Sequence, residues 1–385
     1  MLGLPSVLAL GGSRCRTPAG PDGTVREVWL APQSGRTRSR PVVAGDVVFF
    51  ADGDGAIVAR DVATGNARWS TKVATPGTIE GAELVTGGDV VLAQSIRETI
   101  ALRRSDGVER WRYSAPLDTT YDGNPGVVQA THAVADATTA YIPAWGASVS
   151  AVDLTTASPR WKWHFGRVSS DTAANVFRSG ATGVAIAGDT VFAAVWHDRD
   201  VSSGGRDAFL VALDRQNGRE LSRVALPRGT NGSVSVSAAP LVFTDVVVVA
   251  TVYGYVYGVN RTSLEIAWTF RSAQFVFATL SQPAAMGDVL YIDGGDERLY
   301  ALDAHNGAVL WTVASVGAFR DLFATSRRVY VTNGHSLLVH DRADGHNVAT
   351  VTLPVDGEIM TTAAAARGDQ IFITRSFGAW SFREP

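Results

Sequence analysis

A phrase of the form Ala-Leu-Asp-x-x-x-Gly, followed four residues later by Trp, recurs along the chain and limits its fold more than any other feature. The clearest copy has Ala301-Leu302-Asp303, then Gly307 and Trp311. Copies start at residues 59, 101, 151, 212, 258, 301 and 339. Neighbouring copies are therefore roughly 40 to 60 residues apart, a period typical of the blades of a β-propeller.

The copies differ in how completely they match the phrase. Ser222 occupies the place of Trp in the fourth copy, and Leu264 occupies the place of Gly in the fifth. The positions that carry the repeat are Asp61, Gly65, Trp69, Gly107, Trp111, Asp153, Trp161, Asp214, Gly218, Trp268, Asp303, Gly307, Trp311, Asp341 and Gly345. We expect each Trp to be wedged between neighbouring blades, where its large area is best buried.

Each copy also carries the signals of short strands. A Gly-Asp turn such as Gly287-Asp288 precedes an apolar run, and a Gly-containing hairpin leads to the next strand. Apolar runs bounded by Gly and Asp are typical of strands, and the Asp-x-x-x-Gly segment turns the chain because Gly tolerates positive φ. One copy thus predicts a blade of four short antiparallel strands.

The two ends of the chain complete the count. Gly378 precedes Phe382 by four residues, which predicts Phe382 as an eighth anchor, but the chain stops before a Trp strand. Residues 27–30, Glu-Val-Trp-Leu, can supply that strand from the N-terminus. We predict an all-β, eight-bladed propeller closed by strands from both ends, which leaves no long exposed edge, with seven blades as the alternative.

The repeat resembles the tryptophan-docking repeat of the quinoprotein (PQQ-like) β-propeller family, over residues 26–385. The chain length is similar to that of the compact, BamB-type members. The dehydrogenases of the family imply a pyrroloquinoline quinone (PQQ) site beneath an adjacent disulfide, with a calcium ion. The chain has one cysteine, Cys15, and cannot form that disulfide. The nearest candidate for calcium, Asp52-Gly53-Asp54, is better explained as a hairpin tip, so we expect no cofactor, with PQQ and calcium as alternatives.

Composition favours one globular body over residues 26–385. The chain has 385 residues, of which 46% are hydrophobic and 18% charged, and its net charge of −3 gives no basic footprint for nucleic acid. No apolar run reaches the length of a membrane span. Residues 1–25 include a short apolar stretch and Cys15, which we interpret as a degenerate or truncated export signal and linker, or else as a start without targeting meaning.

Insertions in blades three and four are where we expect function, because loops on a rigid scaffold carry it. The first insertion contains Tyr121, Asp122 and Asn124, and the second ends in Trp196, His197, Asp198 and Arg199. Trp145 lies outside the repeat positions. The second group could place an aromatic face, an imidazole and an Asp–Arg pair at the mouth of the ring, or could be a tolerated hairpin extension. His305, His340 and His346 are expected to be structural, His340 as a satisfied, half-buried side chain.

We therefore predict a non-catalytic, monomeric propeller that is secreted, periplasmic or attached to the cell envelope, and that binds a protein or peptide partner as a rigid scaffold. The alternative is a propeller that binds a small ligand or acts as a PQQ-dependent dehydrogenase.

Overall fold

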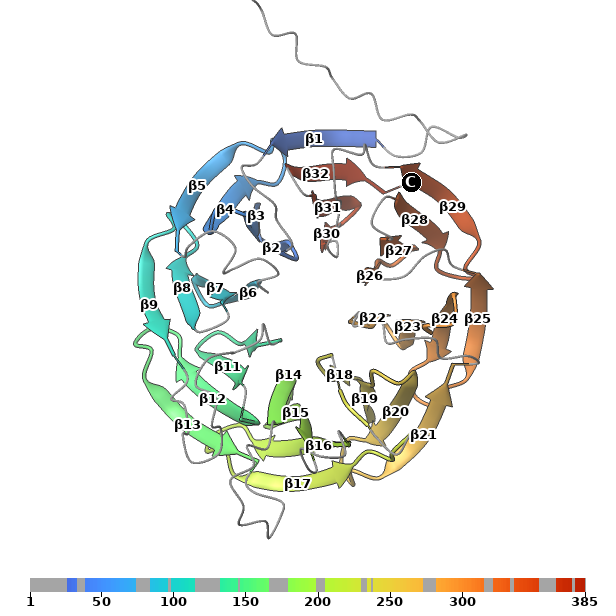
Figure 1. Ribbon diagram of the computed structural model, residues 1–385. Coiled ribbons are helices and arrows are strands. Elements are labelled where there is room, and N and C mark those ends of the chain that lie inside the picture. The colour runs from blue at the N-terminus through green and yellow to red at the C-terminus, as the bar shows by residue number, and fades with distance from the viewer. Residues whose placement is uncertain are drawn as a thin grey trace, which may run out of the picture.

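The protein is an eight-bladed β-propeller, as the computed structural model shows (Figure 1). The structure describes residues 26–32, 39–73, 84–95, 98–114, 132–144, 146–165, 179–198, 205–229, 234–236, 238–272, 282–314, 321–332, 336–352, 365–375 and 378–384. All elements in these ranges are strands, and they form eight separate four-stranded antiparallel sheets arranged in a ring. The prediction of eight blades is confirmed. Residues 1–25 lie outside the described residues.

Each blade runs from an inner strand beside the ring axis to an outer strand at the rim. Blade 1 comprises β2 (Val42–Ala44), β3 (Val47–Ala51), β4 (Ala56–Asp61) and β5 (Ala67–Lys72), and blade 2 comprises β6 (Leu84–Gly87), β7 (Val90–Gln94), β8 (Thr99–Arg103) and β9 (Glu109–Tyr113). Blade 3 comprises β10 (Val134–Ala135), β11 (Thr139–Ala144), β12 (Ser148–Asp153) and β13 (Pro159–His164), and blade 4 comprises β14 (Ser179–Ala187), β15 (Thr190–Asp198), β16 (Arg206–Asp214) and β17 (Glu220–Ala225). Blade 5 comprises β18 (Leu241–Val242), β19 (Val246–Ala250), β20 (Tyr255–Asn260) and β21 (Ile266–Arg271), and blade 6 comprises β22 (Ala284–Met286), β23 (Val289–Asp293), β24 (Arg298–Asp303) and β25 (Val309–Ala314). Blade 7 comprises β26 (Asp321–Ala324), β27 (Arg328–Thr332), β28 (Ser336–Asp341) and β29 (Asn347–Thr352), and blade 8 comprises β30 (Ala365–Arg367), β31 (Gln370–Arg375), β32 (Gly378–Arg383) and β1 (Arg26–Pro32).

Blade 8 joins the two ends of the chain, as predicted. Its outer strand is β1, which pairs with β32 in antiparallel register. The ladder places Ser381 opposite Trp29, just as Ala59 lies opposite Trp69 in blade 1. The eighth anchor is therefore Ser381, and the prediction of Phe382 was wrong by one residue. Gly378 pairs with the last residue of its outer strand, as Ala56 does in blade 1. In both blades the anchor follows this position by three residues, whereas the prediction assumed four.

Each repeat Trp docks on the turn of the following blade. The indole N–H groups of Trp29, Trp69, Trp111, Trp161, Trp268 and Trp311 donate to the backbone carbonyls of Val62, Arg104, Leu154, Arg215, Ala304 and Arg342, at 2.8–3.1 Å. The ring lies directly over the Gly of that turn, where a methyl group on Gly218 would be 2.5 Å from Trp161. The interpretation of these tryptophans as blade packing is confirmed.

Two turns place another residue where the repeat has Gly. Ala157 receives Trp111 and keeps the left-handed backbone, with φ 61°. Leu264 also keeps it, with φ 56°, although a branched side chain strains this conformation. The blade before Leu264 has exposed Ser222 in place of Trp, and the Leu264 side chain is buried at that seam. The seam between blades 4 and 5 is thus filled by a leucine from blade 5.

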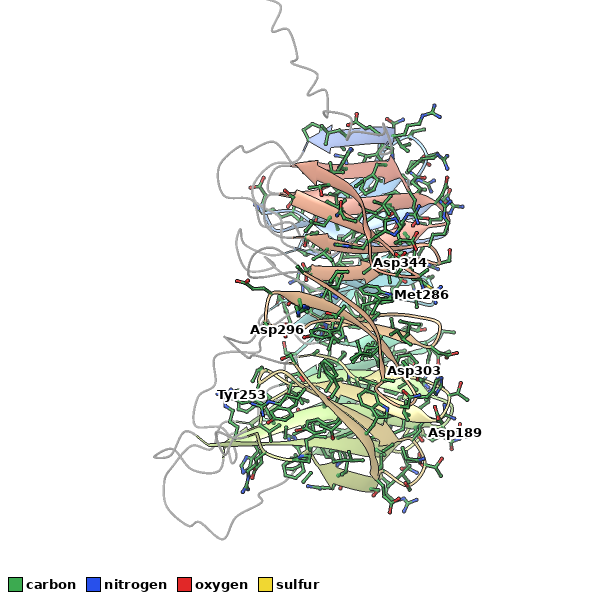
Figure 2. All side chains as sticks on the ribbon, turned by 90° about the vertical axis from the view of Figure 1, so that its right-hand side faces the viewer. Asp189, Tyr253, Met286, Asp296, Asp303 and Asp344 are labelled. Carbon is green, nitrogen blue, oxygen red and sulfur yellow. The ribbon has the colours of Figure 1, made fainter. Side chains whose placement is uncertain are left out.

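The disc has two dissimilar faces. The Gly-Asp turns and the Asp-x-x-x-Gly turns lie on one face, which we call the turn face. Asp189, Asp303 and Asp344 lie on this face in Figure 2. The hairpins between the second and third strands of each blade lie on the opposite, hairpin face, where Figure 2 shows Tyr253 and Asp296.

Candidate functional site

Blade 4 extends farther than the others at the hairpin face. Its strands β14, β15 and β16 each have nine residues, whereas β3 has five and β4 has six. The ladder pairs β15 with β16 without interruption from Thr190 to Asp198. The run of Val, Phe, Ala and Trp in β15 favours a strand throughout, so the inserted residues lengthen the sheet itself. We call the outer part of this hairpin, residues 195–198 and 206–209, the blade 4 projection.

Three predicted site residues, Trp196, His197 and Asp198, lie in the blade 4 projection. Trp196 and His197 are buried, with exposed fractions of 6% and 8%. The Arg206 guanidinium lies 4.4 Å from the Trp196 ring, which is a cation–π contact. Asp198 pairs with Arg206 in the strand register, although its side chain lies outside the described residues. The aromatic face of Trp196 is therefore covered by an arginine, and contact between Trp196 or His197 and a ligand stays a prediction.

Aromatic packing from blade 3 supports one side of the blade 4 projection. Phe165 lies 4.8 Å from Phe209 and 6.3 Å from His197 between ring centroids, and the Arg223 guanidinium lies 4.4 Å from the Phe165 ring. These contacts bury Phe165 and fix His197 against it. Neighbouring Trp163, which the repeat does not require, donates its indole N–H to Glu220 at 3.0 Å and is buried, so it also packs the seam.

Blade 5 supports the other side. Val234 N–H donates to the Arg206 carbonyl at 2.9 Å, and the Tyr257 hydroxyl donates to the Pro227 carbonyl at 2.9 Å. Tyr257 stacks on Tyr255 with ring planes 5° apart. Burial raises the pKa of Tyr257 to about 12, so its hydroxyl stays a donor. Trp196 of the blade 4 projection lies in one buried cluster with Val234 and Tyr257, so the projection is packed on this side as well.

Other predicted site residues cannot be placed. Tyr121, Asp122, Asn124, Trp145 and Arg199 lie outside the described residues. Their proposed contacts with a ligand or partner stay predictions.

The proposed hairpin tip at Asp52 is confirmed. The Asp52 carboxylate accepts the N–H groups of Asp54 and Ala56 at 3.1 and 2.8 Å, and burial raises its pKa. The same oxygen that could bind calcium therefore already caps the hairpin. With a single cysteine, the chain also lacks the disulfide that the PQQ site of the dehydrogenases would need. The expectation of no cofactor, with PQQ and calcium as alternatives, stays a prediction.

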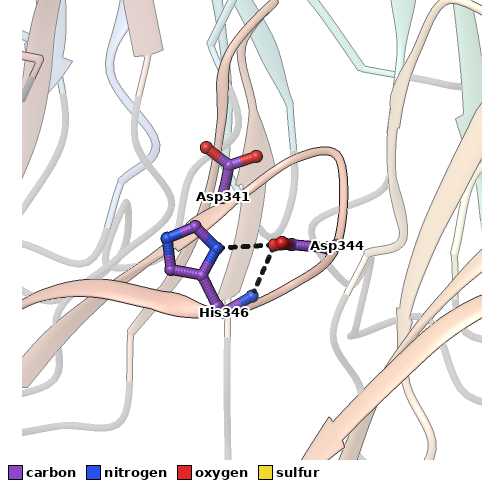
Figure 3. Close-up of side chains that lie close together, drawn as sticks. All are labelled: Asp341, Asp344 and His346. Atoms are coloured by element: carbon purple, nitrogen blue, oxygen red, sulfur yellow. Dashed lines mark hydrogen bonds and ion pairs between the residues drawn. The ribbon is translucent and has the colours of Figure 1, made fainter.

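Sequence reasoning missed a group of potential metal ligands on the turn face. Ligand atoms of Asp341, Asp344 and His346 lie within 4.8 Å of one another (Figure 3). Asp344 accepts the backbone N–H and the Nδ1 of His346 at 3.0 and 2.6 Å, while Asp341 pairs with Arg328 at 2.5 Å and accepts the Ala343 N–H. Because these bonds belong to the repeat's turn, the group has a structural explanation and we assign no metal to it.

His340 differs from its prediction. Its Nδ1 bonds the Gly345 carbonyl at 2.8 Å, but the side chain is almost fully buried and Nε2 has no hydrogen-bond partner among the residues that the structure describes. Burial lowers its pKa, because the protonated ring would have to remain desolvated. The corresponding residues in blades 2, 4 and 6 are Leu102, Leu213 and Leu302, which are buried apolar groups at the same place.

The docked tryptophans, the closure by both chain ends and the blade count define the class as a tryptophan-docking β-propeller. The sequence matches the family model described as "Outer membrane protein assembly factor BamB" over residues 22–202 and 206–367, and the chain belongs to this family. No curated protein matches the chain by sequence. The described residues contain no helix with the length and hydropathy of a membrane span.

Solved structures confirm the architecture. BamB from Moraxella catarrhalis is 13% identical, with a TM-score of 0.69 over 93% of this chain and 99% of its own. The designed protein Ika8 is 13% identical, with a TM-score of 0.68 over 92% of this chain and 99% of its own. The quinohemoprotein alcohol dehydrogenase from Comamonas testosteroni is 13% identical, with a TM-score of 0.68 over 94% of this chain and 76% of its own. At these identities the likeness concerns the fold.

Proposed function

We propose that this protein is a non-catalytic scaffold outside the cytoplasm that binds a protein partner of the cell envelope through its hairpin face. The observation that carries the proposal is the blade 4 projection. It lengthens three strands beyond the ring and is braced on both sides by buried aromatic side chains. A rigid projection loses little conformational entropy when a partner binds, which favours its use as a contact surface.

The family supports the same proposal, because its description refers to the assembly of outer membrane proteins. A scaffold of this kind would present the arginine of the blade 4 projection to a partner without any chemical step. The covered face of Trp196 fits this use, since the cation–π contact holds the half-buried Arg206 guanidinium in a fixed position over the ring.

Site-specific photo-crosslinking tests the proposal. A photoreactive residue replaces Arg206 on the blade 4 projection, and the matched control replaces exposed Thr262 on the turn face of blade 5. In intact cells we expect a discrete envelope protein crosslinked from position 206 and none from position 262. Equal crosslinking from both positions, or none from position 206, would contradict the proposal.

The alternative function has its own readout. A ligand that binds only the folded state raises the melting temperature in a saturable way. A saturable rise on adding PQQ with Ca²⁺ would favour the dehydrogenase-type propeller. We expect the melting temperature to stay unchanged.

A further inference from the structure

The outer strand of blade 6 differs from those of the other blades. An outer strand presents a free backbone edge, and charged side chains on such an edge prevent unwanted pairing. Outer strands β1, β5, β9, β13, β17 and β21 each carry Lys or Arg, whereas β25 (sequence Val-Leu-Trp-Thr-Val-Ala) carries no charge. It exposes Val309 by 48% and Leu310 by 52%. The outer strand β29 is also uncharged, but at the positions of Val309 and Leu310 it has the polar Asn347 and the half-buried Val348.

Blades 1, 2 and 3 carry an arginine directly before the docked Trp, and blade 1 shows what this arginine does. Arg68 directly precedes the docked Trp69, and its guanidinium bonds Asp46 at 2.5 Å and Asp61 at 2.7 Å. The pKa of Asp61 falls to about 2, chiefly through the hydrogen bond from Arg68. One arginine therefore both charges the edge and neutralises two turn-face carboxylates. Arg110 of blade 2 also pairs with the Asp of its own Gly-Asp turn, Asp89.

In blade 6 the arginine is missing and its two carboxylates remain. Leu310 precedes Trp311 as Arg68 precedes Trp69, and Asp288 and Asp303 occupy the places of Asp46 and Asp61. The Asp288 side chain is 74% exposed, and the cationic group beside it is His305, whose Nε2 lies 3.2 Å away. His305 is also bonded to Asp245 of blade 5. Arg342 of blade 7 also lies at this turn, where it donates to the Met286 carbonyl. The turn end of β25 is thus an apolar edge beside three carboxylates, those of Asp245, Asp288 and Asp303, with His305 and one arginine as the cationic groups.

We propose that the outer edge of β25 is a strand-addition site for an extended segment of a partner protein, with alternating apolar residues and a Lys or Arg at the end that meets Asp288 and Asp303. Backbone groups of β25 supply the pairing, since β25 is the last strand of its sheet and Figure 1 places it at the rim. Val309 and Leu310 supply apolar contact, and the Lys or Arg of the partner takes the place that Arg68 fills in blade 1. The inference rests on the proposed function, since both assume a protein partner. The contact surface here is the outer edge of β25 and not the blade 4 projection.

The test uses a fluorescein-labelled peptide, Lys-Thr-Val-Thr-Val-Thr-Val-Lys, and the full-length protein. Fluorescence anisotropy is expected to show saturable binding, and amide hydrogen exchange is expected to slow at residues 309–314. Leu310→Arg introduces the arginine that blades 1 to 3 carry at this position and should weaken binding at least about tenfold, which is roughly 1.4 kcal/mol. A peptide with Glu in place of both Lys residues should also bind more weakly.

The matched control is Arg68→Leu, which removes the arginine of blade 1 but leaves Lys72 on β5, so the peptide affinity and the number of peptide sites should stay those of the wild type. Equal affinity of the wild type and Leu310→Arg would overturn the proposal, as would no binding up to the peptide's solubility limit. A wild-type dimer that Leu310→Arg converts to a monomer in light scattering would assign the edge to a second copy of this chain instead. If crosslinking at position 206 succeeds while the peptide fails to bind, the edge proposal alone is wrong.

Discussion

The two seams that bound blade 4 are filled from opposite sides. Between blades 3 and 4, Trp161 comes from the earlier blade and lies over Gly218 of the later one. Between blades 4 and 5, the earlier blade contributes Ser222 and the later one fills the space with Leu264. A seam between two blades therefore needs one large apolar side chain. Leu264 compensates for the Trp that Ser222 replaces, so we call these two departures from the repeat the compensated unit. Leu310 differs, because it is exposed and the group beside Asp288 is His305 of the same blade, not an arginine on the outer strand.

The largest effect should come from filling the space beneath a docked Trp. Gly218→Ala and Gly188→Ala lie in the same blade, and both residues have positive φ. Only the methyl group at position 218 meets an indole ring, while nothing lies within 4 Å at position 188. We expect Gly218→Ala to lower the free energy of unfolding by about 3 kcal/mol and Gly188→Ala by about 1 kcal/mol, as measured by urea denaturation. Equal losses would mean that the docking contact contributes little.

Removing the buried, half-satisfied His340 should have the opposite sign. Leucine fits the corresponding position in blades 2, 4 and 6, so His340→Leu should raise the free energy of unfolding by about 1 kcal/mol at pH 7.5. The pKa of His340 is lowered in the folded protein, so the wild type should lose stability as the pH falls below about 6.5, the unfolded value. The variant should not share that loss. Parallel stability–pH curves for the two proteins would contradict this assignment.

His305 should give the smallest effect. Its pKa is raised by the hydrogen bonds to Asp245 and then Asp288, so its stabilising contribution is complete below about pH 6.5 and is lost as the pH rises through the folded value. Because all three side chains are partly exposed, we expect His305→Gln to lower the free energy of unfolding at pH 6 by less than about 0.5 kcal/mol. Unfolding measured at pH 6 and pH 8.5 checks this, and a larger loss at pH 8.5 would reverse the assigned sign.

The repeat predicted most of the fold because it encodes contacts directly. Each Asp-x-x-x-Gly segment and each Trp belong to one turn and one dock, so Gly218 and Trp161 could be assigned without the structure. The anchor Ser381 was missed because the hairpin between the second and third strands varies in length between copies of the repeat, and this length sets the register of the third strand. Ser222 and Leu264 were visible in the sequence as two departures in neighbouring copies of the repeat. Only the packing shows that Leu264 fills the space left by the missing Trp.

The candidate site was less predictable. Trp196 and His197 have side chains suited to binding, but the lengthened sheet buries them, and burial depends on Phe165 and Val234, which are far from them in the sequence. The contrast between Arg68 and Leu310 was readable once the copies are aligned. The structure was required to interpret this contrast as a binding site, because the interpretation depends on the exposure of Leu310 and on the positions of Asp288 and Asp303.

A double-mutant cycle at the blade 4–blade 5 seam tests the compensated unit most directly. Ser222→Trp alone should be destabilising because its ring meets Leu264, and Leu264→Gly alone should be destabilising because it empties the seam. The double variant restores the arrangement of the docked seams. We predict that it is more stable than either single variant, with a coupling free energy of about 2 kcal/mol. Additive losses in the free energy of unfolding would show that the two departures are unrelated and would contradict the account.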